Sequence, residues 1–178
     1  MRIISGYHKG RRISAPKKLP VRPTTDMAKE ALFNILNHRY YFDDITVLDL
    51  CAGIGSISFE FASRGTTKIT AVDEHHGCTK FIDKTAKELD MPITVIKDDL
   101  LIFLKRTKER YSIIFADPPY SFSSEQLQEI TELVFDGNLL EENGLLIIEH
   151  TKHIDLSSDE HFSEVKHYGG SVFSFFVG

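Results

Sequence analysis

This sequence predicts an α/β fold with a mostly parallel sheet, and two observations support that prediction. Five short apolar segments typical of buried strands alternate with amphipathic segments typical of helices. Such alternation indicates βαβ units, in which helices cover both faces of a parallel sheet. The chain then ends in two strand-like segments on either side of Gly169-Gly170, which predict an antiparallel hairpin at one edge of the sheet.

The N-terminal elements are expected to be a small basic β-hairpin with a linker, residues 1–22, followed by the main domain, residues 23–178. In RIISGYHKGRRISAP, isoleucines flank two turn-forming glycines, which is typical of a hairpin. In TTDMAKEALFNILNH, apolar residues recur at helical spacing, so this segment predicts an amphipathic helix. Its polar start supplies capping residues, and Pro23 suits the helix entry.

The remaining elements follow in regular alternation. Gly65 is expected just beyond the end of the first helix of this series. The sequence FSFF in the last segment is interpreted as a core strand. The expected strands are residues 46–50, 68–73, 93–96, 112–116 and 145–150, and the expected helices are residues 56–64, a segment around 81–89, 100–104 and 124–135.

Size and composition indicate one soluble domain. The chain has 178 residues, of which 42% are hydrophobic and 26% are charged. No apolar run approaches the roughly 20 residues that a membrane-spanning helix requires, so no membrane partner is expected. Cys51 and Cys78 do not form a disulfide framework, which favours a reducing, cytoplasmic location. A monomer is the default expectation.

Positive charge is concentrated at the N-terminus. The formal net charge is −5, yet residues 1–25 contain seven Lys and Arg residues and no Asp or Glu. A basic segment on an acidic body predicts one electropositive face that binds a polyanion, with a solubilising tail as the simpler alternative. The candidate contacts to such a polyanion are Arg2, Lys9, Arg11, Arg12 and Arg22.

Acidic residues stand at the ends of four consecutive predicted strands. These residues are Asp49, Asp73, the pair Asp98-Asp99, and Asp117. In open α/β sheets, ligands bind outside the carboxyl ends of the strands. The sequence therefore predicts a binding site to which all four strands contribute.

The segment LDLCAGIGS predicts a tight turn from a strand into a helix. Gly53 and Gly55 would let the backbone approach a ligand, and Asp73 lies at the distance along the chain at which an acid reaches ribose hydroxyls. Two glycines alone are weak evidence, and the third glycine of a dinucleotide-binding fingerprint is missing. Asp49 suits a positively charged group. A nucleoside with an amino-acid tail fits the pattern, with its adenine at Asp99.

The segment FADPPYSF predicts a stiff, exposed corner after a buried strand. The carboxylate of Asp117 and the carbonyls of Pro118 and Pro119 are acceptors, and Tyr120 offers a flat ring beside them. Such a corner suits a planar base with an exocyclic amine, although a plain proline turn is the simpler alternative.

The chain resembles the class I S-adenosylmethionine-dependent methyltransferases, and more narrowly the RsmD family of 16S rRNA guanine-N2 methyltransferases. The broad resemblance rests on VLDLCAGIGSISFEFASRG and FADPPY, and the narrow one on RIISGYHKGRRISAP and RPTTDMAKEALFNIL. It implies a Rossmann-like, mostly parallel seven-stranded sheet with an antiparallel C-terminal edge hairpin. It also implies methyl transfer to N2 of a guanine in 16S rRNA, by resemblance guanine 966, with the 30S subunit or an assembly intermediate as the partner.

Carried over by motif, the resemblance assigns residues to two groups. The S-adenosylmethionine contacts would be Asp49, Ala52, Gly53, Gly55, Asp73, Asp98, Asp99 and Thr25, and the target guanine would contact Asp117, Pro118, Pro119 and Tyr120. Met27 stands where the family usually has a basic residue, and Cys51 replaces a commoner residue, so the details of RNA contact depart from the pattern.

Three alternative functions stay open at this point. A DNA adenine or protein glutamine methyltransferase can use a similar corner, but the first usually needs a recognition insertion and the second favours Asn at position 117. A non-catalytic ribosome-assembly factor would not need an intact corner and glycine turn. No metal site is expected, because the adjacent His75 and His76 diverge on a helix and lack zinc-ligand spacing.

Overall fold

The computed structural model describes residues 1–22 and 24–178. Pro23, the expected helix entry and first residue of the expected main domain, lies outside the described residues. The helices are α1 (Asp26–Asn37), α2 (Ser56–Ser63), α3 (His76–Glu88), α4 (Leu100–Arg106) and α5 (Ser124–Asp136), with a 3-10 helix η1 (Phe42–Asp44). The strands are β1 (Thr46–Leu50), β2 (Lys68–Asp73), β3 (Ile93–Lys97), β4 (Tyr111–Ala116), β5 (Leu140–His150), β6 (Phe162–Tyr168) and β7 (Ser171–Val177).

The strands form one mixed sheet in the order β3-β2-β1-β4-β5-β7-β6. The first five strands are parallel, and β7 runs antiparallel between β5 and β6. The predicted α/β fold with an antiparallel C-terminal hairpin is therefore confirmed. Because the strand order reverses between β1 and β4, a crevice is expected outside the carboxyl ends of these two strands.

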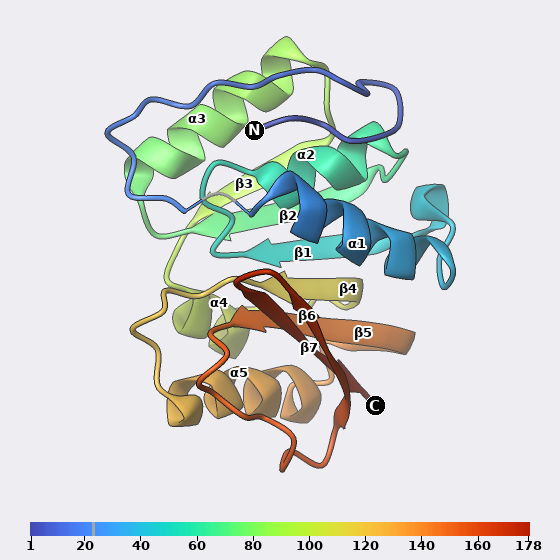
Figure 1. Cartoon of the computed structure of the whole chain (residues 1–178), viewed down its shortest axis with the longest axis vertical. Coiled ribbons are helices and arrows are strands. Elements are labelled where there is room, and N and C mark those ends of the chain that lie inside the picture. The colour runs from blue at the N-terminus through green and yellow to red at the C-terminus, as the bar shows by residue number, and fades with distance from the viewer. Residues whose placement is uncertain (23) are drawn as a thin grey trace.

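Helices cover both faces of the parallel part of the sheet (Figure 1). Successive strand residues point to opposite faces, so Val47 packs in the cluster beneath α1, α2 and α3, whereas Leu48 packs in the cluster with α4 and α5. Ile113 and Ile114 divide between the two clusters in the same way. The strands are thus buried on both sides, which explains why their sequences are continuous apolar runs.

Strand β5 begins at Leu140, five residues before the predicted start. The predicted start was wrong because the polar run EENG resembles a turn. In the structure Glu141 accepts hydrogen bonds from Thr46 Oγ1 (3.0 Å) and Ser112 Oγ (2.8 Å), which tie the run to β1 and β4. The β4–β5 register shifts between Tyr111 and Ile113, and this irregularity accommodates the extra residues.

The N-terminal segment, residues 1–22, is part of the main core. It pairs with itself as predicted, but through a single bridge between Arg2 and Arg12 instead of a ladder of strands. Ile3 and Ile13 are buried in the same cluster as α1 and α2. In Figure 1 this segment crosses over α3 and returns to the start of α1.

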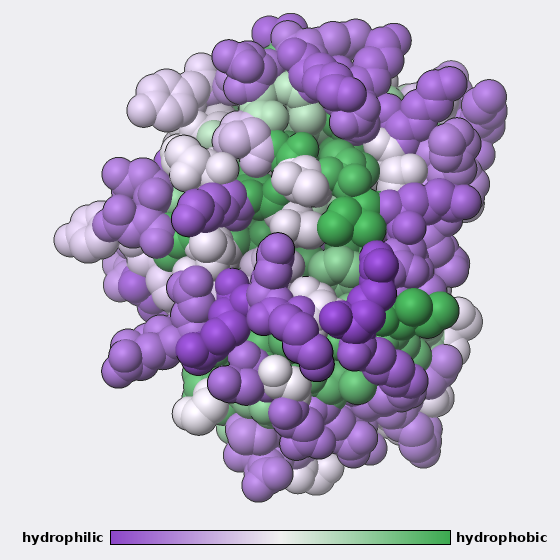
Figure 2. Space-filling model, turned by 180° about the vertical axis from the view of Figure 1, so that it is seen from behind, coloured by the Kyte–Doolittle hydropathy of each residue, from purple (hydrophilic) through white to green (hydrophobic). Residues whose placement is uncertain are grey.

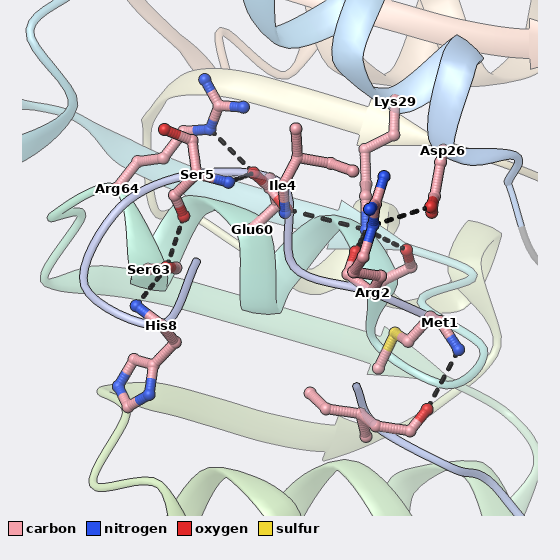
Figure 3. Close-up of polar contacts among 12 residues, drawn as sticks. Met1, Arg2, Ile4, Ser5, His8, Asp26, Lys29, Glu60, Ser63 and Arg64 are labelled. Carbon is pink, nitrogen blue, oxygen red and sulfur yellow. Dashed lines mark hydrogen bonds and ion pairs between the residues drawn. The ribbon is translucent and has the colours of Figure 1, made fainter. Parts of the chain in front are cut away.

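A buried acidic residue fastens the N-terminal segment to α2 (Figure 3). Glu60, which is 0% exposed, accepts the backbone N–H groups of Ile4 (2.9 Å) and Ser5 (3.1 Å). Next to it, Gly6 has a positive φ and lies so close to Ser63 that a Cβ would stand 1.9 Å from the Ser63 carbonyl oxygen. Only glycine fits this position without a shift of backbone.

The surface is mostly hydrophilic, with apolar side chains gathered in the middle of the face shown in Figure 2. Among the described residues, no helix combines the length and the apolar character needed to span a membrane.

Candidate active site

A cleft of about 610 Å³ lies at the carboxyl ends of β1, β2, β3 and β4. Pro20, Val21, Arg22 and Thr24, from the segment that leads into α1, form one of its walls. The cleft brings together the acidic residues that the sequence predicted at the strand ends, namely Asp49, Asp73, Asp98, Asp99 and Asp117. Their convergence follows directly from the parallel order of the strands that carry them.

The glycine turn after β1 takes a left-handed path. Cys51 has φ 57°, Gly53 has φ 57° and Gly55 has φ 83°. A Cβ on Gly55 would stand 2.8 Å from the Phe59 ring and 3.1 Å from Ile82, so glycine is required there by packing as well as by conformation. Ala52 and Gly53 line the cleft, whereas Gly55 is not among the lining residues.

Asp73 holds this turn in place from the end of β2. One carboxylate oxygen accepts the Gly53 N–H at 2.9 Å, and the other accepts the His75 N–H at 2.8 Å. Each carboxylate oxygen has a second lone pair, so Asp73 retains acceptor capacity toward a ligand hydroxyl. The residue predicted to bind ribose therefore also organises the glycine loop.

Asp49 is a buried acid at the floor of the cleft, 1% exposed. Its Oδ2 accepts the Ser58 hydroxyl at 2.6 Å and the Ser58 N–H at 3.1 Å. Burial raises the pKa of Asp49 to about 7; the Ser58 hydrogen bonds oppose this rise and the charge of Asp73 adds to it. A positively charged group in the cleft would stabilise the ionised form.

Asp98 and Asp99 are both partly engaged by neighbouring groups. Asp99 caps α4, because its Oδ1 accepts the N–H groups of Leu101 (2.9 Å) and Ile102 (3.0 Å). Asp98 lies 2.8 Å from the Arg106 guanidinium. Both side chains line the cleft beside Leu100, where the sequence predicted an adenine contact.

The corner after β4 forms another wall of the cleft. Asp117, Pro118 and Pro119 line it, and Tyr120, which follows them, is 42% exposed and does not line the cleft itself. The Pro119 carbonyl accepts the N–H of Phe122 at 2.9 Å, which closes the turn. Of the two proline carbonyls predicted as acceptors, that of Pro119 is therefore already engaged within the turn.

Arg22 lies inside this corner. Its Cζ stands 3.3 Å from the centroid of the Tyr120 ring, which is a stacking contact. Its Nη2 lies 3.5 Å from Asp117 Oδ1 and 3.9 Å from Glu149 Oε1. The residue predicted as a polyanion contact is therefore placed against the two carboxylates of the corner.

Glu149, near the end of β5, lies behind the corner next to Arg22, although it does not line the cleft itself, and the sequence patterns did not indicate it. It is 1% exposed, and its Oε2 lies 3.5 Å from Thr24 Oγ1. The pKa of Asp117 is raised well above its usual value by burial and then by the charge of Glu149, while Arg22 opposes the rise. Burial also raises the pKa of Glu149. The rule used for the other strands, that an acid at the end of a parallel strand points to the binding site, could have found Glu149 if it had been applied to the fifth strand.

The other predicted contacts lie outside the cleft. Thr25 caps α1 through a 3.2 Å hydrogen bond from the Ala28 N–H, and Thr24 instead lines the cleft. Arg2 pairs with Asp26 at 3.1 Å. The side chains of Lys9, Arg11 and Arg12 are exposed on the N-terminal segment.

His75 and His76 follow β2, and the structure gives His75 a capping role in α3. His75 caps α3 by accepting the Cys78 N–H at 3.3 Å. Within residues 1–22 and 24–178, no group of three or more His, Cys, Asp or Glu side chains is arranged to hold a metal ion.

The residues of the cleft fit the S-adenosylmethionine that the sequence predicts. A buried carboxyl with a raised pKa, Asp49, can meet a positive charge on the ligand. Asp73 and Asp99 offer acceptor oxygens on the neighbouring strands, and the volume lies within the range of small-molecule sites.

Known proteins resemble this chain along most of its length. Two are named ribosomal RNA small subunit methyltransferase D: one from Haemophilus influenzae, 29% identical, with 98% of this chain and 91% of that protein covered, and one from Escherichia coli K12, 30% identical, with 84% and 74% covered.

Solved structures show the same fold. A hypothetical protein of Thermus thermophilus superposes with a TM-score of 0.85 at 24% identity, covering 99% of this chain and 98% of that chain. The T. thermophilus 16S rRNA N2 G1207 methyltransferase, solved with AdoMet and guanosine, gives a TM-score of 0.70 at 16% identity, covering 89% of this chain and 44% of that chain.

A family model described as conserved hypothetical protein 95 matches residues 1–177. Because that match spans nearly the whole chain and the fold agrees with it, the protein belongs to this family, the RsmD family of methyltransferases.

Proposed function

We propose that this protein transfers a methyl group from S-adenosylmethionine to the exocyclic N2 of a guanine in small-subunit ribosomal RNA. The observation that carries the proposal is that Asp117, Pro118 and Pro119 of the corner line the same cleft as Ala52 and Gly53 of the glycine turn. The names of the two methyltransferase D relatives support rRNA as the substrate. The G1207 enzyme, which is named for N2 methylation, supports the guanine amine as the acceptor on this fold.

The cleft residues divide the work between the two reactants. Bound S-adenosylmethionine supplies an electrophilic methyl group. Asp73 and the turn that it holds would position the ribose and the amino-acid tail, with Asp49 facing positive charge. Leu100, Asp98 and Asp99 would border the adenine.

The corner would hold the guanine and align its amine. A base stacked in a helix is out of reach, so the guanine must be presented in a loop or flipped out. The Asp117 carboxylate and the Pro118 carbonyl would accept the amine hydrogens, and Tyr120 would stack on the ring. The corner would thereby align N2 with the methyl group that bound S-adenosylmethionine supplies, and the methylated amine would lose one proton. Much of the acceleration would come from this alignment.

Asp117 is suited to take the proton that the amine releases. Burial and the nearby Glu149 raise the pKa of Asp117, so this carboxylate is more basic than an exposed one. Proton loss to water is the alternative route.

The N-terminal segment would bind the phosphates of the RNA. It carries exposed basic side chains and forms one wall of the cleft, so RNA on its surface would extend toward the corner. We infer that the substrate is the 30S subunit or an assembly intermediate, that the enzyme acts as a monomer, and that it is cytoplasmic.

The test is a transfer assay with S-adenosylmethionine labelled in the methyl group. The substrates are 30S subunits and free 16S rRNA from cells that lack the endogenous activity, and the product nucleosides are separated. Label in N2-methylguanosine supports the proposal. Label only in the proteins of the subunit, or no label despite cofactor binding, contradicts it.

Asp117→Ala tests the role of the corner. We expect transfer to fall by about a hundredfold or more, because a positioning acceptor for the reacting amine is removed. Binding of S-adenosylmethionine should remain close to that of the wild type, since the Asp117 side chain is paired with Arg22 and does not hold the glycine turn, which is held by Asp73. Wild-type turnover by this variant would contradict the proposed role.

A further inference from the structure

The corner contains a second buried carboxylate to which neither the sequence motif nor the proposed mechanism gives a role. Glu149 is 1% exposed and comes from β5, whereas Asp117 follows β4. A carboxylate buried without full compensation is costly, which suggests that this one is retained for a purpose.

Arg22 shows where the two carboxylates point. A single nitrogen, Nη2, lies 3.5 Å from Asp117 Oδ1 and 3.9 Å from Glu149 Oε1. The guanidinium to which it belongs stacks on the Tyr120 ring at 3.3 Å. A flat group with N–H donors on one edge therefore already occupies the place beside Tyr120.

The shape of that group has a close counterpart in one nucleobase. A guanidinium is a planar carbon with N–H donors around it. Guanine carries the same N–C–N unit at its N1, C2 and N2 atoms, where N1–H and the N2 amine are adjacent donors. Adenine has an acceptor at N1, and a carboxylate facing that atom would repel it.

We propose that Glu149 is a specificity-determining residue that accepts the N1–H of guanine while Asp117 accepts the N2 amine. Arg22 then occupies the base position until the guanine enters, and leaves it when the base stacks on Tyr120. This inference rests on the proposed function, because it specifies how the same corner selects its base.

The surroundings of Glu149 agree with this assignment. Its Oε2 accepts the Thr24 hydroxyl at 3.5 Å from the segment before α1, and the Ser171 side chain also hydrogen-bonds this carboxylate. Its Oε1 is the oxygen that faces Arg22. One oxygen is thus held by the protein, and the other is directed at the group that stacks on Tyr120.

The experiment compares guanine with 2-aminopurine at the position that the enzyme methylates. 2-Aminopurine keeps the N2 amine but has an acceptor at N1. A ligated 16S rRNA carries either base at the mapped position, and kcat/KM for methyl transfer is measured for both. The variants are Glu149→Gln, whose amide can also donate to N1, and Glu141→Gln as the matched control.

Glu141 is a suitable control because it lies on the same strand and its carboxylate also accepts side-chain hydrogen bonds, from Thr46 and Ser112. It lies at the amino end of β5, whereas Glu149 lies near the carboxyl end, and its partners Thr46 and Ser112 are at the amino ends of β1 and β4. Binding of S-adenosylmethionine and thermal unfolding verify that both variants are folded.

We expect the wild type and Glu141→Gln to have a higher kcat/KM with guanine than with 2-aminopurine. In Glu149→Gln the ratio of these two values should fall by about tenfold or more, which is the effect of one hydrogen bond to a charged group. An unchanged preference in Glu149→Gln, with guanine still methylated, overturns this inference and leaves the proposed function intact. No transfer to guanine by the wild type overturns both.

Discussion

Glu60, the acid buried beneath the N-terminal segment, and the acids buried in the cleft have opposite surroundings. Glu60 accepts two backbone N–H groups, the Arg64 Nε at 2.9 Å, and lies 3.6 Å from the Lys29 ammonium. Lys29 in turn donates to the Arg2 carbonyl at 2.6 Å and to Ser56 Oγ at 3.1 Å. This cluster is fully engaged within the protein (Figure 3).

The cleft acids have fewer partners at a similar depth. Asp49 relies on Ser58 alone, and Asp117 faces Arg22, whose side chain is 46% exposed. Glu149, beside the cleft, faces Arg22 and hydroxyl groups but, among the described residues, no buried cation. Their pKa values are raised, first by burial. Buried charge that the protein satisfies holds the fold together, whereas buried charge that it leaves partly unsatisfied indicates a binding site.

Glu60→Gln should produce the largest loss of stability. It removes the charge opposite Lys29 and Arg64 and leaves a buried ammonium poorly compensated, a change that typically costs about 3–5 kcal/mol. Urea denaturation at neutral pH measures the free energy of unfolding. The matched control is Glu88→Gln, which removes an exposed pair with Lys84 and should change stability by less than about 0.5 kcal/mol. Equal effects of the two variants would contradict the distinction.

Asp49→Asn should make the protein more stable than the wild type at neutral pH, in contrast to the loss expected for Glu60→Gln. The pKa of Asp49 is about 7 in the folded protein and near 4 when unfolded, so between these values only the folded state binds the proton. The free energy of unfolding of the wild type should therefore fall as pH rises from about 4 to about 7, by an amount on the order of 3–4 kcal/mol from this group.

The asparagine of the variant does not ionise. The free energy of unfolding of the variant should therefore increase relative to that of the wild type as pH rises through this range. Urea denaturation at pH 5 and pH 8 measures the difference. The same variant should bind S-adenosylmethionine more weakly, because it lacks the charge. A constant difference between the two proteins at both pH values would show that Asp49 is not held with a raised pKa.

The sequence predicted the cleft acids because their position follows from one topological rule. Asp49, Asp73 and Asp117 all come at the ends of parallel strands, so recognising the strands was enough to bring them together. The start of β5 was predicted wrongly because its first residues are polar and are held by side chains of β1 and β4, contacts that no local pattern shows.

The buried cluster of Glu60, Lys29 and Arg64 could not be predicted from the order of the strands. Glu60 meets Ile4 across 56 positions of the chain, and it sits on a helix where an acid normally indicates a solvated face. Lys29 likewise interrupts an amphipathic helix that would be expected to place it in water. Only the docking of the N-terminal segment, a tertiary event, gives these residues their partners.

Arg22→Ala tests whether the partly compensated carboxyls beside Arg22 govern activity, and we expect a smaller effect than from the two preceding variants. Arg22 lowers the pKa values of Asp117 and Glu149, so its removal should move the acidic limb of the pH profile of kcat/KM to higher pH. The control is Arg39→Ala, which removes a comparably exposed pair with Glu164 and should leave the profile unchanged. An unshifted profile for Arg22→Ala would show that these carboxyls do not govern activity.

The smallest effect is expected from the exposed charges of the N-terminal segment, which have neither the burial of Glu60 nor the enclosure of the cleft. Arg11→Ala with Arg12→Ala should weaken RNA binding and reduce the slope of log K against log salt by about one unit per lost phosphate contact. The control, Lys68→Ala with Lys108→Ala, removes two exposed charges near the amino ends of β2 and β4, opposite the cleft. Equal slopes for the two double variants would mean that RNA is attracted by overall charge, and that the N-terminal segment is a structural cover without a specific role in binding.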